Sequence, residues 1–319
     1  MRVAVTYLDG EEWRDGVVAH AASGLRVIPE ADTTGLPRLD GVITGGFTDH
    51  HVHLQLVDIA PLAGSALGRV VDLGGDPSVL SELRIVEGVE VLFAGAFLTP
   101  RGGYPSDRSW APAGSVREIA DEDAAERAIV EMKESGAVRI KVASNRAAGP
   151  VFSDTLLRAI VSIAASHRIP IVAHAEGPGE AQRVVRLGAE RLAHAPFSER
   201  LTDAEISGQA ASAAWISTLA VHADEAYGIA IDNVRRFRSA GGTVLYGTDL
   251  GNGPMPVGLN PREIGALREA GLDDADLLQC LAPVDPTTAG SHPLFYPGAT
   301  PDTADPLLAR LLTPADLEA

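Results

Sequence analysis

The feature that most constrains the fold is a regular alternation of short apolar runs with longer segments of helical periodicity, from residue 41 to about residue 290. Most of the short runs are continuously apolar, which is typical of parallel strands that are covered on both faces. Strands that alternate with helices in this way predict an α/β fold. We expect eight strands, at residues 41–46, 69–73, 89–97, 138–142, 170–173, 191–193, 214–219 and 243–247.

The segments between these runs carry signals for helix starts. Ser153, Thr202 and Asn260 each precede a run with helical periodicity, and all three are residue types that cap helix N-termini. Ser115 opens a Ser-x-x-Glu sequence, the form of a capping box. We therefore expect a helix that begins at Ser115 and ends at Gly136.

Eight alternations over this length match a (β/α)8 barrel, which typically has about 250 residues. The alternative is a doubly wound open sheet, in which a Gly-x-Gly-x-x-Gly loop would follow the first strand. The sequence there is Gly45-Gly46-Phe47, which does not have that form. We predict a (β/α)8 barrel over residues 41–290, a small β appendage formed by residues 1–40, and a C-terminal tail, residues 291–319, that packs on the barrel or the appendage.

The charge balance limits the class of partner. The chain of 319 residues has 26 Lys and Arg against 43 Asp and Glu, a net charge of −17. Nucleic acids and anionic membranes need a basic face, so neither is expected. Cys280 is the only cysteine, which excludes a disulfide framework and a thiolate metal cluster. With no signal-peptide pattern at the start, we expect a cytoplasmic protein with a small-molecule substrate, and we leave homo-oligomer formation open.

Metal-ligand residue types occur at the ends of five predicted strands. His51 and His53 are two residues apart, so on an extended chain both rings lie on the same side. Four further polar residues each follow an apolar run that should be buried, where an unpaired polar group is costly. Because the C-terminal ends of barrel strands form one rim, these side chains should meet there. The six candidate ligands are His51, His53, Lys141, His174, His194 and Asp249.

The segments that contain these residues resemble the amidohydrolase superfamily of metal-dependent hydrolases, in its imidazolonepropionase-like and prolidase-like branch. The resemblance covers about residues 40–290 and implies a distorted (β/α)8 barrel with a binuclear metal centre. It implies one metal held by His51, His53 and Asp249, and a second held by His174 and His194, with Lys141 bridging both. The matching segments are 46–54 (GFTDHHVHL), 71–75 (VDLGG), 140–144 (IKVAS), 173–177 (AHAEG), 192–194 (LAH) and 245–249 (LYGTD).

Lys141 needs a physical explanation in such a site. A protonated ammonium group would be repelled by nearby dications, so the side chain must be neutral, point away, or be converted to an anion. In the family, carbon dioxide carbamylates this lysine; the alternatives are that Lys141 extends outward or pairs with a carboxylate. Nitrogen and oxygen ligands without thiolate suit two Zn²⁺ ions, with Mn²⁺, Co²⁺ or Fe²⁺ as substitutes.

The ligand set indicates a reaction class. Two metals about 3.5–4 Å apart can share a hydroxide that attacks a carbonyl carbon. We expect hydrolysis of a C–N bond in a small amide, lactam or dipeptide-like substrate, with Lys141 and Asp249 as catalytic residues and Asp249 carrying the proton to the leaving nitrogen. The alternatives are lactone or phosphotriester hydrolysis, decarboxylation or isomerisation on the same scaffold, and a metal-free relative without enzyme activity. Glu176 stands two residues after His174, whereas the deaminases of the superfamily need a Glu three residues after it, so nucleobase deamination is disfavoured.

Other polar residues near the strand ends are candidates for substrate binding. The long segment 98–114 is the candidate for a lid that determines specificity, because long loops at this rim shape the pocket. Its Pro and Gly content is equally typical of a plain surface loop. His50 should point away from the two ligands that flank it in sequence and is expected to be structural. The family's usual C-terminal return to the N-terminal strands is not recognisable, so we expect the appendage to be reduced to what residues 1–40 can build. The substrate-binding candidates are Arg101, Tyr104, Thr218, His222 and Tyr227.

Overall fold

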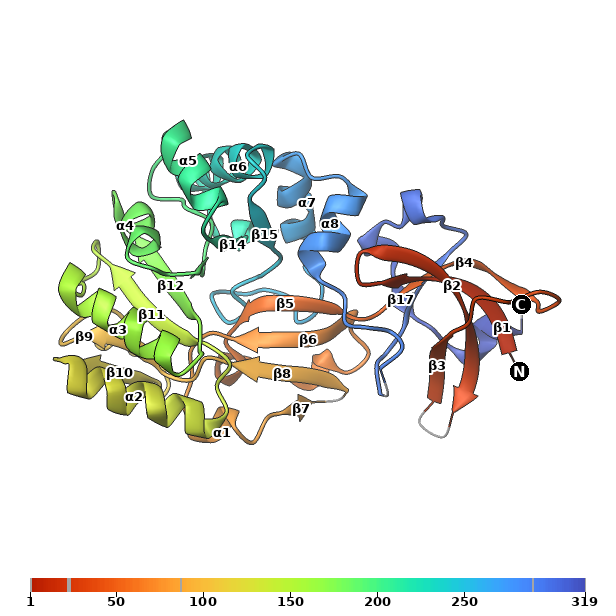
Figure 1. Ribbon diagram of the computed structural model, residues 1–319, viewed down its shortest axis with the longest axis horizontal. Helices are drawn as coiled ribbons and strands as arrows, with labels where there is room; N and C mark the ends of the chain where they lie inside the picture. Colours follow the sequence, from red (N-terminus) through yellow and green to blue (C-terminus); the bar gives the residue numbers. More distant parts are fainter. Residues whose placement is uncertain (1, 22–23, 87, 289, 319) are drawn as a thin grey trace.

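A computed structural model describes residues 2–21, 24–86, 88–288 and 290–318. The chain forms an α/β body and, at one end of it, a smaller β appendage (Figure 1). The body contains a four-stranded sheet of order β5-β6-β8-β7 and a seven-stranded sheet of order β10-β9-β11-β12-β13-β14-β15. All pairs in these sheets are parallel except the β7/β8 hairpin. The predicted α/β class with parallel strands is confirmed.

Backbone hydrogen bonds also connect the two sheets of the body. On one side, Val138 N donates to Phe93 O at 2.9 Å; on the other, His53 N donates to Leu250 O at 2.7 Å. The strands of the body are β5 (Phe47–Val52), β6 (Leu67–Asp72), β7 (Ile85–Val86), β8 (Val89–Phe93), β9 (Phe97–Pro100), β10 (Val116–Ile119), β11 (Ile140–Asn145), β12 (Ile171–Glu176), β13 (Arg191–Leu192), β14 (Ala214–Ile216) and β15 (Thr243–Leu245).

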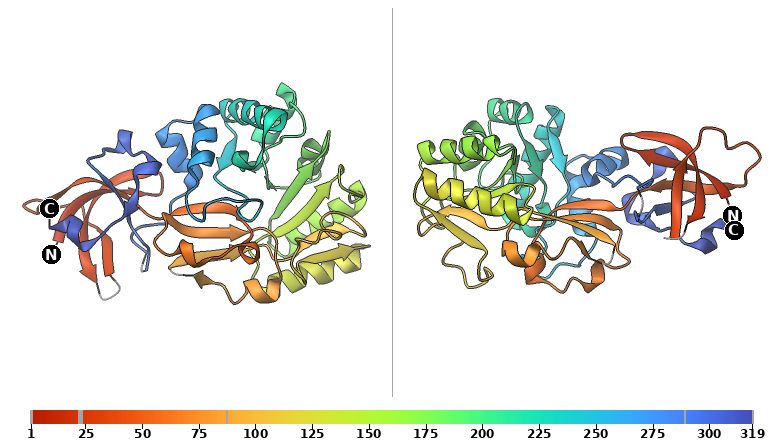
Figure 2. Two further views of the ribbon diagram at one scale, coloured as in Figure 1. Left: turned by 180° about the vertical axis from the view of Figure 1, so that it is seen from behind. Right: turned by 60° about the horizontal axis from the view of Figure 1, so that its bottom comes forward.

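Helices lie on the outer side of the body strands, as the views from behind and from below also show (Figure 2). In the described part of the chain, none of them is both long and apolar enough to cross a membrane. The α-helices are α1 (Pro77–Leu80), α2 (Glu122–Ser135), α3 (Asp154–Ser166), α4 (Glu180–Arg186), α5 (Asp203–Ala210), α6 (Asp224–Ser239), α7 (Pro261–Glu269) and α8 (Asp274–Leu281). Short 3-10 helices are η1 (Leu54–Leu56), η2 (Ala60–Leu62), η3 (Leu219–Val221), η4 (Pro301–Thr303), η5 (Pro306–Leu308) and η6 (Pro314–Leu317).

Three of the predicted helix starts are confirmed. Ser153 caps α3, Asn260 caps α7, and Thr202 forms a capping box at the start of α5. The helix predicted from Ser115 is wrong at its start, because the segment after it forms β10 and pairs in parallel with β9. The cap of α2 is Asp121 instead, and the helix ends at Gly136 as predicted, with φ at 94°.

Two glycines explain where predicted strands are wrong. The run predicted as one strand at residues 89–97 forms two, β8 and β9, separated at Gly95, whose φ of 76° is in the left-handed region. The run at residues 41–46 is not the first strand of the body; that strand is β5. Gly46 ends the run, and a Cβ atom there would lie 2.6 Å from Gly68 Cα, so only glycine lets β5 and β6 start this close together.

The appendage is a six-stranded sheet of order β17-β16-β4-β1-β2-β3. The expectation that residues 1–40 build it alone is wrong, because β16 pairs antiparallel with β4, with Phe295 opposite Ile43. Both side chains belong to a separate hydrophobic cluster of the appendage that also contains Tyr7 and Leu317. The C-terminal segment therefore returns to complete the sheet. Its strands are β1 (Arg2–Asp9), β2 (Glu12–Ala21), β3 (Gly24–Pro29), β4 (Arg38–Thr44), β16 (Leu294–Pro297) and β17 (Arg310–Leu311).

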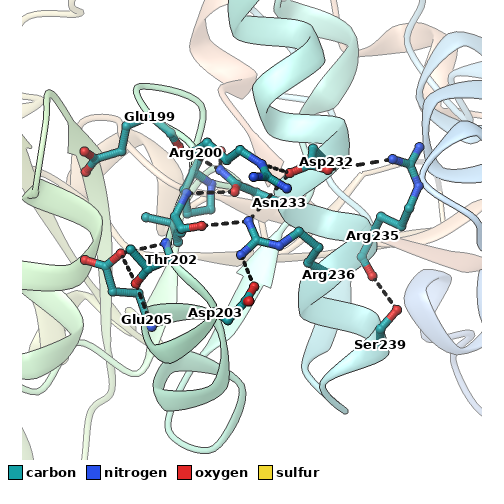
Figure 3. Close-up of polar contacts among 12 residues, drawn as sticks. Glu199, Arg200, Thr202, Asp203, Glu205, Asp232, Asn233, Arg235, Arg236 and Ser239 are labelled. Carbon is teal, nitrogen blue, oxygen red and sulfur yellow. Dashed lines mark hydrogen bonds and ion pairs between the residues drawn. The ribbon is translucent and has the colours of Figure 1, made fainter.

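A polar network anchors the loop that follows β13 to helix α6 (Figure 3). Asn233 is fully buried in α6; its Nδ2 donates to Pro196 O at 2.9 Å and Glu199 O at 2.8 Å, and its Oδ1 accepts from Leu201 N at 3.0 Å. Arg236, one turn later, donates to Leu201 O at 2.6 Å. Helix α6 thus supplies hydrogen-bond partners to backbone groups of three residues in this loop.

Candidate metal centre

Three buried side chains converge at the ends of β5 and β15. Asp249 Oδ1 lies 3.1 Å from His51 Nε2 and 3.2 Å from His53 Nε2. The two Nε2 atoms are 3.3 Å apart. One ligand atom from each residue therefore lies within 4.8 Å of the others, a grouping that could hold a metal ion.

The hydrogen bonds behind the two imidazole rings indicate which nitrogens are free to bind a metal. His51 Nδ1 lies 2.7 Å from Ala193 O, and His53 Nδ1 lies 3.0 Å from Gly74 O. A carbonyl oxygen only accepts, so each Nδ1 donates, and in a neutral ring Nε2 then presents a lone pair. Burial, and next the charge of Lys141, hold the pKa of His51 well below its ordinary value, which favours the neutral ring. At His53, burial is outweighed by the hydrogen bond and charge of Asp249, which raise the pKa of His53 above its ordinary value. When both rings are neutral, two nitrogen lone pairs and a carboxylate oxygen face one another, and these residues fit a divalent cation between them.

Asp249 is held in place by its backbone and by a neighbouring amide. Its φ of 56° is in the left-handed region, which non-glycine residues rarely adopt and which is found most often at functional sites. Asp249 N donates to His51 O at 2.8 Å, and Asn252 Nδ2 donates to Asp249 Oδ2 at 2.9 Å. Below it, Thr248 Oγ1 donates to the buried Asp49 at 2.6 Å. The carboxylate is therefore positioned before any ligand arrives.

The other predicted ligands lie beside this group. The ring of His194 is 4.8 Å from that of His51 and 4.9 Å from that of His174, between centroids. His174 Nε2 lies 3.1 Å from Glu176 Oε2 and donates to it, which leaves Nδ1 of His174 free. Thr218 engages Nδ1 of His194 at 2.9 Å, which leaves Nε2 of that ring free. The structure thus brings together all the predicted histidine ligands, each with one nitrogen that is not used by its supporting hydrogen bond.

Lys141 lies on β11 and lines the same cavity. It is 1% exposed, so the alternative in which it extends outward to solvent does not hold. Within the described ranges it forms no ion pair with a carboxylate, and its Nζ lies 5.8 Å from the centroid of the Phe97 ring. Burial lowers the pKa of Lys141 to about 7, which makes the neutral amine readily accessible.

Two buried carboxylates hold backbone segments that adjoin the site. Asp72 accepts hydrogen bonds from Leu54 N at 2.7 Å and Gly74 N at 2.9 Å, and so fixes the turn after His53 and the carbonyl that His53 contacts. Glu263 on α7 accepts from Leu219 N at 2.9 Å and Ala220 N at 2.7 Å, at the start of η3. Burial raises the pKa of Glu263 to about 7. Sequence reasoning missed both residues, because their role is visible only once their backbone partners are placed.

The ligand residues open into a cavity of about 430 Å³. Of the predicted substrate-binding residues, Tyr104 and His222 line it, Thr218 lies behind His194, and Arg101 and Tyr227 are not among the described lining residues. Tyr227 donates instead to Glu269 at 2.8 Å on the outside of the body. Trp110, in the segment predicted to form a lid, also lines the cavity. The lining residues that sequence reasoning did not assign are Leu56, Phe97, Glu176, Phe197, Val221, Gly251, Asn252 and Gly253.

The aromatic part of this lining comes from β9 and from the loops that follow β9, β13 and η3. Tyr104 and Trp110, both in the segment predicted to form a lid, lie 6.0 Å apart between ring centroids, and the Tyr104 ring lies 5.3 Å from that of His174. On the other side, the Phe197 ring lies 4.2 Å from that of His222 between centroids, with the two planes tilted by 32°. The aromatic residues in these loops are the sequence signal that could have identified the walls.

The similarity of the chain to known proteins lies in its structure rather than in its sequence. No protein-family model matches the chain, and no curated protein matches it in sequence. Among solved structures, a crystal structure described as an amidohydrolase is 19% identical with a TM-score of 0.72, and covers 98% of both chains. A Xaa-Pro dipeptidase with methionine bound in its active site is 16% identical with a TM-score of 0.70, and covers 97% of this chain and 96% of its own. The ochratoxinase of A. niger is 16% identical with a TM-score of 0.70, and covers 98% of this chain and 94% of its own. The predicted resemblance is confirmed at the level of the fold, which the chain shares with these three structures over nearly its whole length.

Proposed function

We propose that this protein is a metal-dependent hydrolase of the amidohydrolase superfamily that cleaves a C–N bond in a small amide, and that its two parallel sheets form one distorted (β/α)8 barrel. The observation that carries the function is the meeting of His51, His53 and Asp249 with their lone pairs directed at one point. The hydrogen bonds between the ends of β5 and β15 support the barrel, because they continue the pairing across the edges of the two sheets.

A second metal ion would be held by His174, His194 and Lys141. Support comes from the free Nδ1 of His174 and the free Nε2 of His194 beside the first site. Lys141 would serve as a carbamate, because carbon dioxide adds to a neutral amine and the product is an anion that can bridge two cations. Its burial next to the ligand histidines supports this role. The donor set of nitrogen and oxygen favours zinc, with manganese, cobalt or iron as substitutes.

In the proposed reaction, separate residues of the chain transfer the proton and bind the substrate carbonyl. When bound, the metal ions supply Lewis-acid activation of a water molecule and of the substrate carbonyl. Asp249 takes the proton from the attacking water and delivers it to the leaving nitrogen, and the hydrogen bond from Asn252 to Oδ2 orients its carboxylate. His222 lines the cavity with an Nε2 that has no hydrogen-bond partner among the described residues, and we assign it to the substrate carbonyl. Burial lowers the pKa of His222 to about 4, so the ring acts as a neutral donor.

The cavity wall favours a particular kind of amide. The rings of Phe97, Tyr104, Trp110 and Phe197 suit an apolar or aromatic group, and no arginine is present in the described lining to pair with a substrate carboxylate. The hydrogen bond from His174 lowers the pKa of Glu176 below its ordinary value, so this carboxylate is available to an amino group. We therefore favour an aminoacyl amide with an apolar side chain over a dipeptide with a free carboxylate.

Metal analysis together with a substrate panel tests this function. Purified protein should contain divalent metal that a chelator removes, and hydrolysis of amides should return when Zn²⁺, Mn²⁺, Co²⁺ or Fe²⁺ is added back. His53→Asn should lose bound metal, whereas His167→Asn, a histidine that pairs with Glu126 on the outside of the body, should keep it. Faster turnover of lactones or phosphotriesters than of any amide would replace the proposed reaction, and equal metal content in both variants would overturn the site.

A further inference from the structure

A second group of basic side chains lies deeper in the body strands than the metal centre. Arg139 directly precedes β11, two residues before Lys141, and so shares its face of the strand. Arg191 begins β13, two residues before Ala193, which packs inside the body with Val172. Val172 pairs with both Lys141 and Arg191, so a single strand separates β11 from β13, a span of about 10 Å that two arginine side chains can bridge.

Within the described ranges, neither Arg139 nor Arg191 forms an ion pair with a carboxylate. Burial lowers the pKa of Arg191, and the charge of Glu190 offsets this only in part. Arg139 is 8% exposed, and its Nε and Nη1 are shielded from solvent without a hydrogen-bond partner. Both ring nitrogens of His50 are in the same condition. By contrast, the nearby Arg69 pairs with Glu90 at 2.6 Å, and the carboxylate of Glu190 accepts from Ile171 N at 3.0 Å. A buried charge without a partner is strongly disfavoured, so something outside the chain is expected to supply the negative charge.

The electrostatics of the group agree with this reading. Burial, and next the charge of Arg191, lower the pKa of Arg139 to about 9, so the two guanidinium groups are close enough to disfavour each other. Burial, and next the charges of Arg139, Arg191 and Arg69, lower the pKa of His50 to about 3, so its ring is neutral. The chain has 43 acidic residues against 26 basic ones, so carboxylates are plentiful elsewhere.

We propose that Arg139, Arg191 and His50 form a binding site for a small inorganic oxyanion such as phosphate, separate from the metal centre. Guanidinium groups present paired N–H donors that match the oxygens of tetrahedral anions, and an imidazole N–H adds a further donor. The bound anion supplies the missing counter-charge and satisfies the unpartnered nitrogens. Its role is to stabilise the strands that carry Lys141 and His194, independently of turnover.

Thermal unfolding with inorganic phosphate at constant ionic strength tests this site. For the wild-type protein we expect a rise in Tm that saturates with phosphate concentration. Arg139→Gln should abolish that rise, and without phosphate this variant should be at least as stable as the wild type, because it lacks the unpaired buried charge. Arg158→Gln, an exposed arginine on α3, should respond like the wild type.

Two further measurements distinguish the proposed oxyanion site from phosphate binding at the metal centre. If phosphate acted at the metal centre, His53→Asn would lose the phosphate-dependent rise in Tm and Arg139→Gln would keep it. Either result would overturn the proposed oxyanion site. The absence of a saturating rise in the wild type would overturn it as well. If Arg139→Gln does not fold, Arg191→Gln serves in its place. Crystals soaked in bromide should show anomalous density between Arg139 and Arg191, and its absence there would also contradict the proposal.

Discussion

Asp249 and His51 contact each other twice: Asp249 N donates to His51 O at 2.8 Å, and Asp249 Oδ1 lies 3.1 Å from His51 Nε2. The backbone contact joins the end of β15 to β5, and the side-chain contact places a carboxylate oxygen against an imidazole lone pair. The same strand junction that holds the sheets together thus assembles the metal site. A substitution of either residue is expected to reduce the rate of the reaction more than the stability of the fold.

Asp249→Asn should reduce kcat on an amide substrate by at least about 10²-fold, because the amide side chain cannot carry a proton from the attacking water to the leaving nitrogen. The fold should persist, since the backbone contact to His51 remains. Steady-state kinetics and thermal unfolding measure the two effects, and Asp232→Asn, at a surface ion pair on α6, is the control. Retained turnover would remove Asp249 from the mechanism.

Glu176→Gln should raise KM for an aminoacyl amide by about 10–100-fold, the value of one charge-assisted hydrogen bond of about 1.5–3 kcal/mol. The N-acetylated form of the same amide has no charged amino group, so its KM should change much less. Measuring both substrates with both proteins gives the comparison. An equal loss on both would mean that Glu176 acts by orienting His174, which donates to it at 3.1 Å.

Asn233→Ala should lower the free energy of unfolding by about 2–4 kcal/mol, because three buried backbone groups of the loop at residues 196–201 lose their partner. Denaturant unfolding measures this loss. Ser239→Ala on the same helix removes only an exposed hydroxyl that bonds to Arg235 O, and should cost less than about 0.5 kcal/mol. Equal effects of the two changes would contradict the anchoring role.

Glu263 should make stability fall as pH rises. Its pKa is raised to about 7 in the folded protein from 4.5, so between these values the folded state binds the proton more strongly. Ionisation then disfavours folding by about 1.4 kcal/mol per pH unit until the slope levels off above pH 7. Unfolding free energies between pH 5 and pH 8 should show a shallower fall for Glu263→Gln than for the wild type. Parallel profiles would show that Glu263 is ionised throughout.

Local sequence signals predicted which side chains lie together better than they predicted the bounds and pairing of the strands. The His-x-His at residues 51–53 and the polar residues that end later strands predicted which side chains meet, because strand period and strand direction alone place them. Thr202 and Ser153 likewise predicted their helix starts, since capping depends on neighbours a few residues away. These features need no knowledge of distant partners.

The errors arose where distant segments decide the outcome. Ser115 has the form of a helix cap, but the following residues pair with β9, and Asp121 caps the helix instead. The return of β16 to β4 joins residues from opposite ends of the chain, which no local pattern reveals. Glu263 and Asn233 act on backbone groups more than thirty positions away, so the sequence alone does not show their roles.

The shared construction of the appendage has a consequence for biosynthesis. Strand β4 lies between β1 and β16, and β16 is translated only after the whole body has been made. Until then the nascent protein carries an edge strand whose apolar residues lack a neighbour, the kind of surface through which chains aggregate. Strand β16 therefore covers an edge of β4 that is exposed throughout the synthesis of the body.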